Sequence, residues 1–162
     1  MNHLKILGVD PGVKKIGWAI GEKKRDFKLI DFDCLQINSP EKNFLVLFDF
    51  FEKIIKKYKP NSLVIEKIIF SKNKKTAIQI AKAIGIIELL AQKYNLDIIE
   101  IAPKELKKMI VGDGSASKEQ IKKILKISFK KDFKKSMPDT LDAISLALVG
   151  FYLTKQKKLL EF

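Results

Sequence analysis

Residues 4–12 read Leu4-Lys5-Ile6-Leu7-Gly8-Val9-Asp10-Pro11-Gly12, an apolar run that ends in a carboxylate and a tight Pro-Gly turn. A second apolar run, at residues 16–20, leads straight back. Apolar side chains occupy both faces of the first run, which is typical of a central, covered strand. Asp-Pro-Gly is also an ordinary turn sequence. The stretch therefore predicts a strand and hairpin that present Asp10 either as a metal ligand or as a turn residue.

The composition of the chain predicts one soluble, globular domain that spans residues 1–162. Apolar residues make up 46% of the 162 residues and charged residues 31%, which is the range of folded proteins. No apolar run approaches the ~18 residues that a membrane helix requires. Asp10 interrupts the only apolar stretch that could begin a signal peptide. Cys34 and His3 are the single cysteine and histidine, so we expect no disulfide and a cytoplasmic location.

The charge of the chain is strongly positive, with 32 Lys and Arg residues against 19 Asp and Glu and a formal net charge of +13. An excess of this size favours a polyanionic partner, most simply nucleic acid. A lysine-rich coding bias is the alternative, because Arg25 is the only arginine. A membrane surface is a poorer partner, because no basic stretch has an apolar face with aromatic anchors.

The order of the expected elements predicts an α/β fold with a mixed five-stranded sheet flanked by helices. We expect strands at 3–9, 15–21, 27–36, 63–66 and 97–101. We expect helices at 39–58, 72–94, 103–110 and 117–127, and a last one from Pro138; Ser39 and Ser117 are the expected N-caps. Residues 155–162 are expected to form a loose C-terminal tail.

The expected helix at 72–94 is apolar on more than one side in its middle. The small residues Ala77, Ala81 and Gly85 recur at every fourth position, which permits another helix to approach closely. This pattern favours a homodimer formed through the helix, and burial within the domain is the alternative.

Four carboxylates are set apart by their positions in the chain. Asp10 and Glu66 each end an apolar strand, and Asp139 and Asp142 share one face of the first turn of the last helix. If the first and fourth strands are neighbours, all four can converge. Crowded acids raise each other's pKa unless cations intervene, and Mg²⁺ is the usual cation for oxygen ligands. Two such ions ~3.5–4 Å apart would support phosphodiester hydrolysis.

Each acid also has an ordinary explanation. Asp10 could be a turn residue, and Glu66 could pair with a surface lysine. Asp139 and Asp142 could simply favour the dipole of their helix. These explanations leave open why all four acids can converge in a strongly basic chain with no other catalytic equipment.

Basic residues surround a glycine loop at 112–114 and form a candidate DNA surface. Lys107 and Lys108 precede this loop, and Lys118 and Lys122 follow it. Residues 118–135 hold eight lysines against two acids. Such a loop could bind a phosphate backbone, and a solvated helix face is the alternative.

An aromatic residue follows the strand that ends in Glu66. Phe70 lies close to Lys72 and Asn73 in sequence. An aromatic side chain beside a catalytic cleft could wedge into a stack of bases. Burial of Phe70 in the core is the alternative.

Four sequence blocks together resemble the RuvC family of Holliday junction resolvases, in that family's order and over nearly the whole chain. The blocks are Leu7-Gly8-Val9-Asp10-Pro11-Gly12 with Gly17-Trp18-Ala19; Ile65-Glu66 with Lys72-Asn73; Val111-Gly112-Asp113-Gly114-Ser115-Ala116-Ser117-Lys118; and Asp139-Thr140-Leu141-Asp142-Ala143. The resemblance implies a ribonuclease H-like fold, a homodimer and Mg²⁺-dependent paired nicking of two like-polarity strands in a four-way DNA junction. It also implies a role in DNA recombination and repair.

The resemblance assigns roles residue by residue. It makes Asp10, Glu66, Asp139 and Asp142 the catalytic acids and the ligands of two Mg²⁺ ions, for which Mn²⁺ could substitute. Lys107 and Lys118 match basic positions near the active site, and Lys72 and Asn73 match the motif after the second acid. A branch-migration helicase is a further partner that the family suggests.

The chain departs from the family pattern at two positions. Ile69 stands where the family often has an aromatic residue that helps to open the junction, and Phe70 is next to it. Ile84 stands where the family often has arginine. These differences affect the expected wedge and DNA contacts.

Three other functions fit parts of the pattern. A YqgF-type ribonuclease H-like nuclease has a similar opening motif, although the block at 107–118 speaks against it. An actin-like ATP-binding domain also begins with an acid-Gly turn, but it needs two lobes. A non-catalytic junction-binding protein would have little use for four intact acids.

Overall fold

The computed structural model describes residues 4–23, 26–38, 43–68, 74–133 and 138–160. Five strands form one sheet in the order β3-β2-β1-β4-β5. The strands are β1 (Leu4–Asp10), β2 (Lys15–Lys23), β3 (Phe27–Gln36), β4 (Ser62–Glu66) and β5 (Asp97–Ile101). The pairs β1–β2 and β2–β3 are antiparallel, whereas β1–β4 and β4–β5 are parallel. The mixed five-stranded sheet that we predicted is confirmed.

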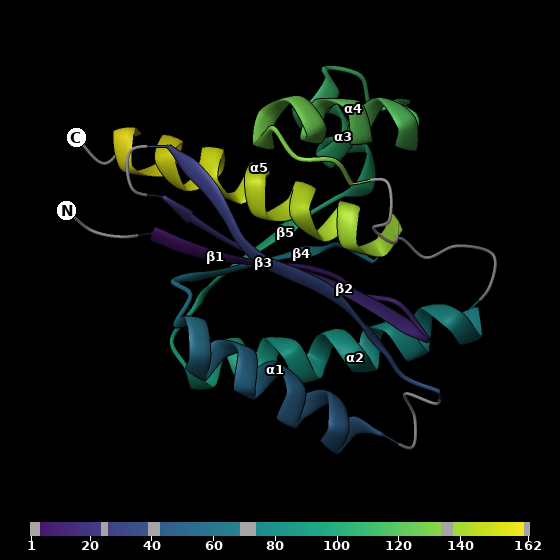
Figure 1. The fold of residues 1–162 in the computed structure, drawn as a ribbon. Coiled ribbons are helices and arrows are strands. Elements are labelled where there is room, and N and C mark those ends of the chain that lie inside the picture. Colours follow the sequence, from purple (N-terminus) through teal and green to yellow (C-terminus); the bar gives the residue numbers. More distant parts are fainter. Residues whose placement is uncertain (1–3, 24–25, 39–42, 69–73, 134–137, 161–162) are drawn as a thin grey trace.

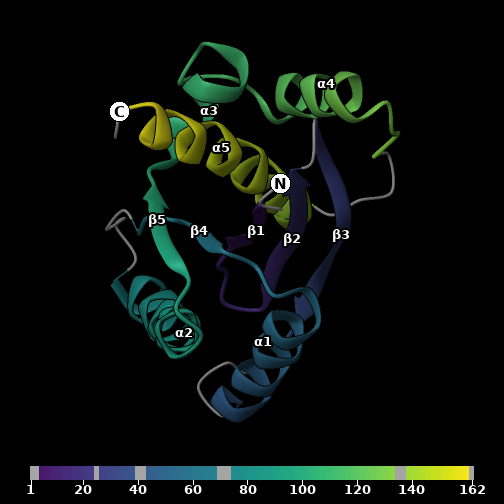
Figure 2. The ribbon, with the colours of Figure 1, turned by 90° about the vertical axis from the view of Figure 1, so that its left-hand side faces the viewer.

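Helices cover both faces of the sheet (Figures 1 and 2). On one face lie α1 (Phe44–Tyr58) and α2 (Lys74–Lys93). On the other face lies α5 (Pro138–Leu160), and α3 (Pro103–Val111) and α4 (Lys118–Phe129) pack outside it. None of the helices in the described ranges is long and apolar enough to cross a membrane.

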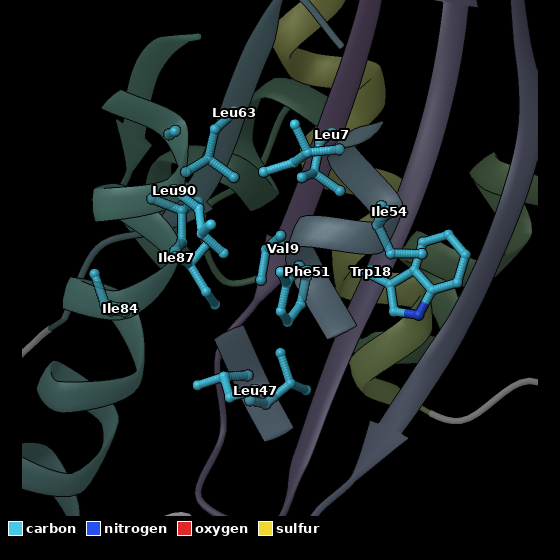
Figure 3. Close-up of a cluster of buried hydrophobic side chains, with 14 of the residues drawn as sticks. Leu7, Val9, Trp18, Leu47, Phe51, Ile54, Leu63, Ile84, Ile87 and Leu90 are labelled. Atoms are coloured by element: carbon cyan, nitrogen blue, oxygen red, sulfur yellow. The ribbon is translucent and has the colours of Figure 1, made fainter. Parts of the chain in front are cut away.

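The core beneath α1 and α2 joins these helices to the central strands. Leu7, Val9 and Leu63 point from the sheet toward Phe51 of α1 and Ile87 of α2 (Figure 3). The buried residues of α1 repeat at helical spacing, because one face of the helix packs on the sheet.

The other core is organised by close approach of α5 to β1 and β2. A Cβ atom on Gly8 would overlap the carbonyl oxygen of Ala143 and lie 2.6 Å from the backbone nitrogen of Ala147. Every residue of α5 from 140 to 151 is buried, apart from the half-buried Asp142. The last helix is therefore enclosed between the sheet and α3–α4, whereas Tyr152, one residue further on, is exposed.

Helix boundaries differ from the sequence prediction at two places. Helix α1 begins at Phe44 after Asn43, so Ser39 is not its N-cap, and residues 39–42 lie outside the described ranges. Helix α5 continues to Leu160, so residues 155–160 are helical, and the loose character expected of the tail at 155–162 stays a prediction. The reason is local, because these residues are mostly strong helix formers and contain neither glycine nor proline.

The contact between Gly8 and α5 predicts a large effect of one methyl group. In Gly8→Ala, the new Cβ would meet backbone atoms of α5, which cannot move aside without shifting the helix. We expect the free energy of unfolding, measured by urea denaturation, to fall by about 3 kcal/mol or more, as in overpacked cores. An unchanged urea midpoint would contradict this packing.

Candidate active site

Asp10 and Glu66 lie next to each other at one edge of the sheet. The parallel pair β1–β4 aligns Val9 with Ile65, and each acid is the next and last residue of its strand. Both strands end in the same direction, so the two carboxylates reach the same edge. The condition that the sequence left open, namely that the first and fourth strands are neighbours, is met.

The N-terminus of α5 lies over the same edge. Gly17 of β2 pairs with Asp10 across the sheet, and a Cβ atom on Gly17 would overlap the backbone of Asp139. Gly17 therefore lets the first turn of α5 rest on the strand beside Asp10. Asp139 and Asp142 both lie in or next to this first turn, where the helix dipole favours negative charge.

Electrostatic coupling shows that the four acids share one region. Burial raises the pKa of Asp10 to about 8, and the negative charges of Glu66, Asp142 and Asp139 contribute to the rise. Burial also raises the pKa of Glu66 to about 7, with a further contribution from Asp142. A buried carboxyl group near other carboxylates is costly to ionise, so both groups retain protons near neutral pH.

Asp142 lies between the acidic and basic groups. Burial raises the pKa of its carboxyl group, and Asp139 raises it further, whereas the positive charges of Lys118 and Lys107 lower it. The Nζ atom of Lys118 is 4.0 Å from Oδ2 of Asp142. Lys118 therefore offsets part of the acidic charge.

The four carboxylates fit a hard divalent cation by their chemistry, but their side chains are not gathered closely. Carboxylate oxygens are the ligands that Mg²⁺ and Mn²⁺ prefer. Within the described ranges, no group of three or more His, Cys, Asp or Glu side chains stands close enough to hold a metal ion.

The predicted basic residues divide into three groups. Lys118 and Lys122 line an open cleft together with Glu119, Pro138 and Asp142. Lys107 is near enough to the acids to lower the pKa of Glu66 and of Asp142. Lys108 is exposed on α3, and its carbonyl oxygen accepts the amide hydrogen of Gly112 at the end of that helix.

The remaining predicted DNA-binding residues are not placed by the structure. Phe70, Lys72 and Asn73 lie outside the described residues, as does Ile69. Their proposed roles as wedge and DNA contacts stay predictions.

The glycine loop positions Lys118. Gly112 ends α3 with a φ of 88°, a left-handed conformation that glycine adopts without strain. Oδ1 of Asp113 accepts hydrogen bonds from the backbone nitrogen and Oγ of Ser115. Ser117 and Gln120 form the capping box of α4, which confirms the predicted N-cap. Lys118 is thus the first residue of a well-defined helix that begins at the cleft.

The sequence analysis missed two residues near the site. Cys34 of β3 pairs with Gly17 of β2, and burial, followed by the charge of Asp139, raises the pKa of the Cys34 thiol. Glu119 lines the cleft beside Lys118. A glycine inside a strand signals close backbone approach, so Gly17 could have pointed to this row of residues.

The fold and the site together define a class of protein. The sheet is mixed and five-stranded, with helices on both faces. Acids stand at the ends of two neighbouring central strands and at the start of the last helix. This arrangement is ribonuclease H-like. The structure of Thermus thermophilus RuvC in complex with a Holliday junction substrate has the same fold. It matches with a TM-score of 0.87 and 16% sequence identity, over 95% of this chain and 96% of that one.

Sequence comparisons give the family. The family model for crossover junction endodeoxyribonuclease RuvC matches residues 6–150. The RuvC of Chloroherpeton thalassium is 34% identical over 161 residues, which cover 96% of this chain and 86% of the relative. The RuvC of Brachyspira hyodysenteriae is 36% identical over 146 residues, which cover 88% and 90%. The chain belongs to the RuvC family of crossover junction endodeoxyribonucleases, as its sequence blocks suggested.

Proposed function

We propose that the chain is a metal-dependent endonuclease that resolves four-way DNA junctions by paired symmetric nicks, in recombination and repair. The observation that carries the proposal is the electrostatic coupling of Asp10 to Glu66, Asp139 and Asp142 at one edge of the sheet. Partly buried carboxylates near one another would destabilise a cluster that had only a structural role, because the charge of each carboxylate makes its neighbours harder to ionise. Family membership and the charge of +13 agree with a DNA substrate.

The four acids are the proposed ligands of two Mg²⁺ ions, with Mn²⁺ as a substitute. When bound, two such ions activate a water nucleophile and stabilise the charge on the attacking and leaving oxygens. Asp10 is the proposed central ligand, because its carboxyl group is coupled to all three others. We propose that the four side chains turn toward one another once cations remove their repulsion.

The lysines of the cleft are proposed to act on the DNA phosphates. Lys118 is 4.0 Å from Asp142, too far for a tight ion pair, so its ammonium remains available to a phosphate oxygen. Lys107 approaches the acids from α3 and Lys122 from the next turn of α4. We propose that these residues, with Lys108, hold the backbone of the cleaved strand against the carboxylates, and that Phe70, Lys72 and Asn73 also contact the DNA.

The alternatives fit the molecule less well. A YqgF-type nuclease shares the opening motif, but the family model for RuvC spans residues 6–150. A non-catalytic junction-binding protein would leave the coupled acids without a use. The nuclease proposal accounts for both the acids and the lysines. A cytoplasmic location and a branch-migration helicase partner agree with action on chromosomal junctions, and we propose both.

Replacing Asp10 tests the catalytic proposal. In Asp10→Asn, we expect Mg²⁺-dependent cutting of a synthetic four-way junction to fall by roughly three orders of magnitude or more, because a lost metal ligand removes several kcal/mol of charge stabilisation. Junction binding should persist, because the substitution removes a negative charge. Gel assays of cleavage and binding measure both effects.

A matched control separates this effect from the loss of any aspartate. Asp49 is exposed on α1, on the opposite face of the sheet. Asp49→Asn should cut the junction at the wild-type rate. Cutting by Asp10→Asn at a similar rate would refute the site assignment, and wild-type protein that binds but never cuts would refute the nuclease proposal.

Paired nicks require two active sites, and we propose that a homodimer formed through α2 supplies them. The buried face of α2 packs on the sheet through residues that include Ala83, Ile87 and Leu90. Its opposite face exposes Ile78 by 54% and Leu89 by 57%. Gly85 lies on this exposed face with open space around it, which would let a second helix approach closely. An exposed apolar face of this kind supports a subunit contact.

A charge on this face of α2 should block the dimer. We expect Leu89→Lys to shift the chain from dimer to monomer in analytical ultracentrifugation, because an ammonium would be buried without a partner. Ile127 is 64% exposed on α4, on the other side of the sheet, so Ile127→Lys is the control and should stay dimeric. A dimeric Leu89→Lys variant would contradict an interface through this face.

A further inference from the structure

A second basic groove lies away from the acids, between the start of β3 and the end of α4. It is lined by Phe27, Lys28, Leu29, Ser128, Phe129, Lys130 and Lys131. Phe27 and Phe129 pack against each other with ring centroids 5.9 Å apart, which joins the strand to the helix. The two elements lie side by side in Figure 2. Packing between the strand and the helix therefore fixes the position of the groove in the fold.

The charge of the groove is positive. Three of its lining residues are lysines, and none of those that the structure assigns to it is acidic. Two acids lie nearby in sequence: Asp132 has the Nζ atom of Lys126 within 3.8 Å, and Asp26 is exposed. The lysines thus outnumber the acids here, and the surface complements an anion.

Aromatic rings pack against one another beside the groove, and two lysines near it contact these rings. The Nζ atom of Lys131 lies 4.5 Å from the ring centre of Phe32, and that of Lys23 lies 5.0 Å from the ring centre of Phe151. Phe27 stacks on Phe151 with ring centroids 5.3 Å apart. The cation–π contact restricts the side chain of Lys131, so less of its freedom is lost when it binds a ligand.

Helix α4 connects this groove to the cleft. Its first residue, Lys118, stands at the acids, and its last residue, Phe129, lines the groove. Twelve residues of α-helix span about 18 Å, which equals the rise of about five base pairs. Lys122, Lys123 and Lys126 lie along the helix between the two ends.

We propose that the groove binds the phosphate backbone of one duplex arm of the DNA, about five base pairs from the cleaved phosphodiester. The proposal rests on the proposed function, which places the cleaved phosphate at the acids. Duplex fits better than unpaired bases, because Phe27 and Phe129 are packed against other rings rather than open for stacking. The lysines would contact phosphates and carry no sequence preference.

Neutral phosphate linkages test the proposal with the protein unchanged. Junctions would carry methylphosphonates four to seven base pairs from the cleavage point on one arm, and binding would be measured with Ca²⁺ in place of Mg²⁺ to prevent cutting. We expect the affinity to weaken several-fold relative to the unmodified junction. Methylphosphonates at an equal number of linkages near the arm's end should have little effect, because they lie beyond the groove.

Paired variants identify the residues. Lys28→Gln with Lys131→Gln removes two charges from the groove. Lys53→Gln with Lys59→Asn removes two charges from the exposed side of α1, and asparagine suits the positive φ of Lys59. We expect the groove variant to lower the salt dependence of binding by about one unit of slope per lysine and the control to leave it unchanged.

Binding of the methylphosphonate junction by the groove variant decides whether the proposal holds. If the groove holds those phosphates, methylphosphonates will weaken wild-type binding and will not weaken the groove variant further. Equal losses in the groove variant and the control, or no effect of the neutral linkages on wild type, would overturn the proposal. Loss of binding to an acidic peptide but not to DNA would assign the groove to a protein partner and overturn it too. Cleavage by wild type is scored separately with Mg²⁺, so failure of the nuclease proposal is distinguishable.

Discussion

The repulsion among four carboxylates is the interaction on which the site depends. The backbone of α5 packs directly on β1 and β2, where Gly8 and Gly17 leave room, and this packing brings Asp139 and Asp142 to the sheet edge that carries Asp10 and Glu66. Burial of α5 between the sheet and α3–α4 stabilises that contact. The pKa values of Asp10 and Glu66 are raised first by burial and then by the neighbouring carboxylates. A divalent cation is the ligand that would relieve this repulsion.

Lysines complement this acidic centre over a wide surface. The lysines of α4 extend the positive charge from the cleft to the groove between β3 and α4. On the other side of the sheet, α1 and α2 form the opposite core and expose an apolar face. The proposed catalytic and DNA-contact regions therefore lie on the α4–α5 side of the sheet, and the proposed subunit contact lies on the α2 side. This arrangement leaves the exposed face of α2 free for the proposed dimer contact while the proposed DNA surface lies on the other side of the sheet.

The sequence predicted the strands and the positions of the acids because both depend on local patterns. Asp10 and Glu66 end apolar runs, and Ser117 caps α4, so each could be recognised without knowing the fold. The adjacency of β1 and β4 was only a condition, because parallel pairing is set by packing of distant segments. The enclosure of α5 was missed for the same reason, since periodicity does not show what covers the second face. The row from Asp10 through Gly17 to Cys34 depends on strand register, which the sequence alone does not specify.

Proton release on metal binding tests the central claim most directly. If the acids share one site whose repulsion a cation relieves, Mg²⁺ must displace the protons that Asp10 and Glu66 hold near neutral pH. Isothermal titration at pH 7, in buffers of different ionisation enthalpy, should show release of about one proton, falling toward zero at pH 9. Mg²⁺ binding without proton release at pH 7, or equal release by wild type and Asp10→Asn, would contradict the account.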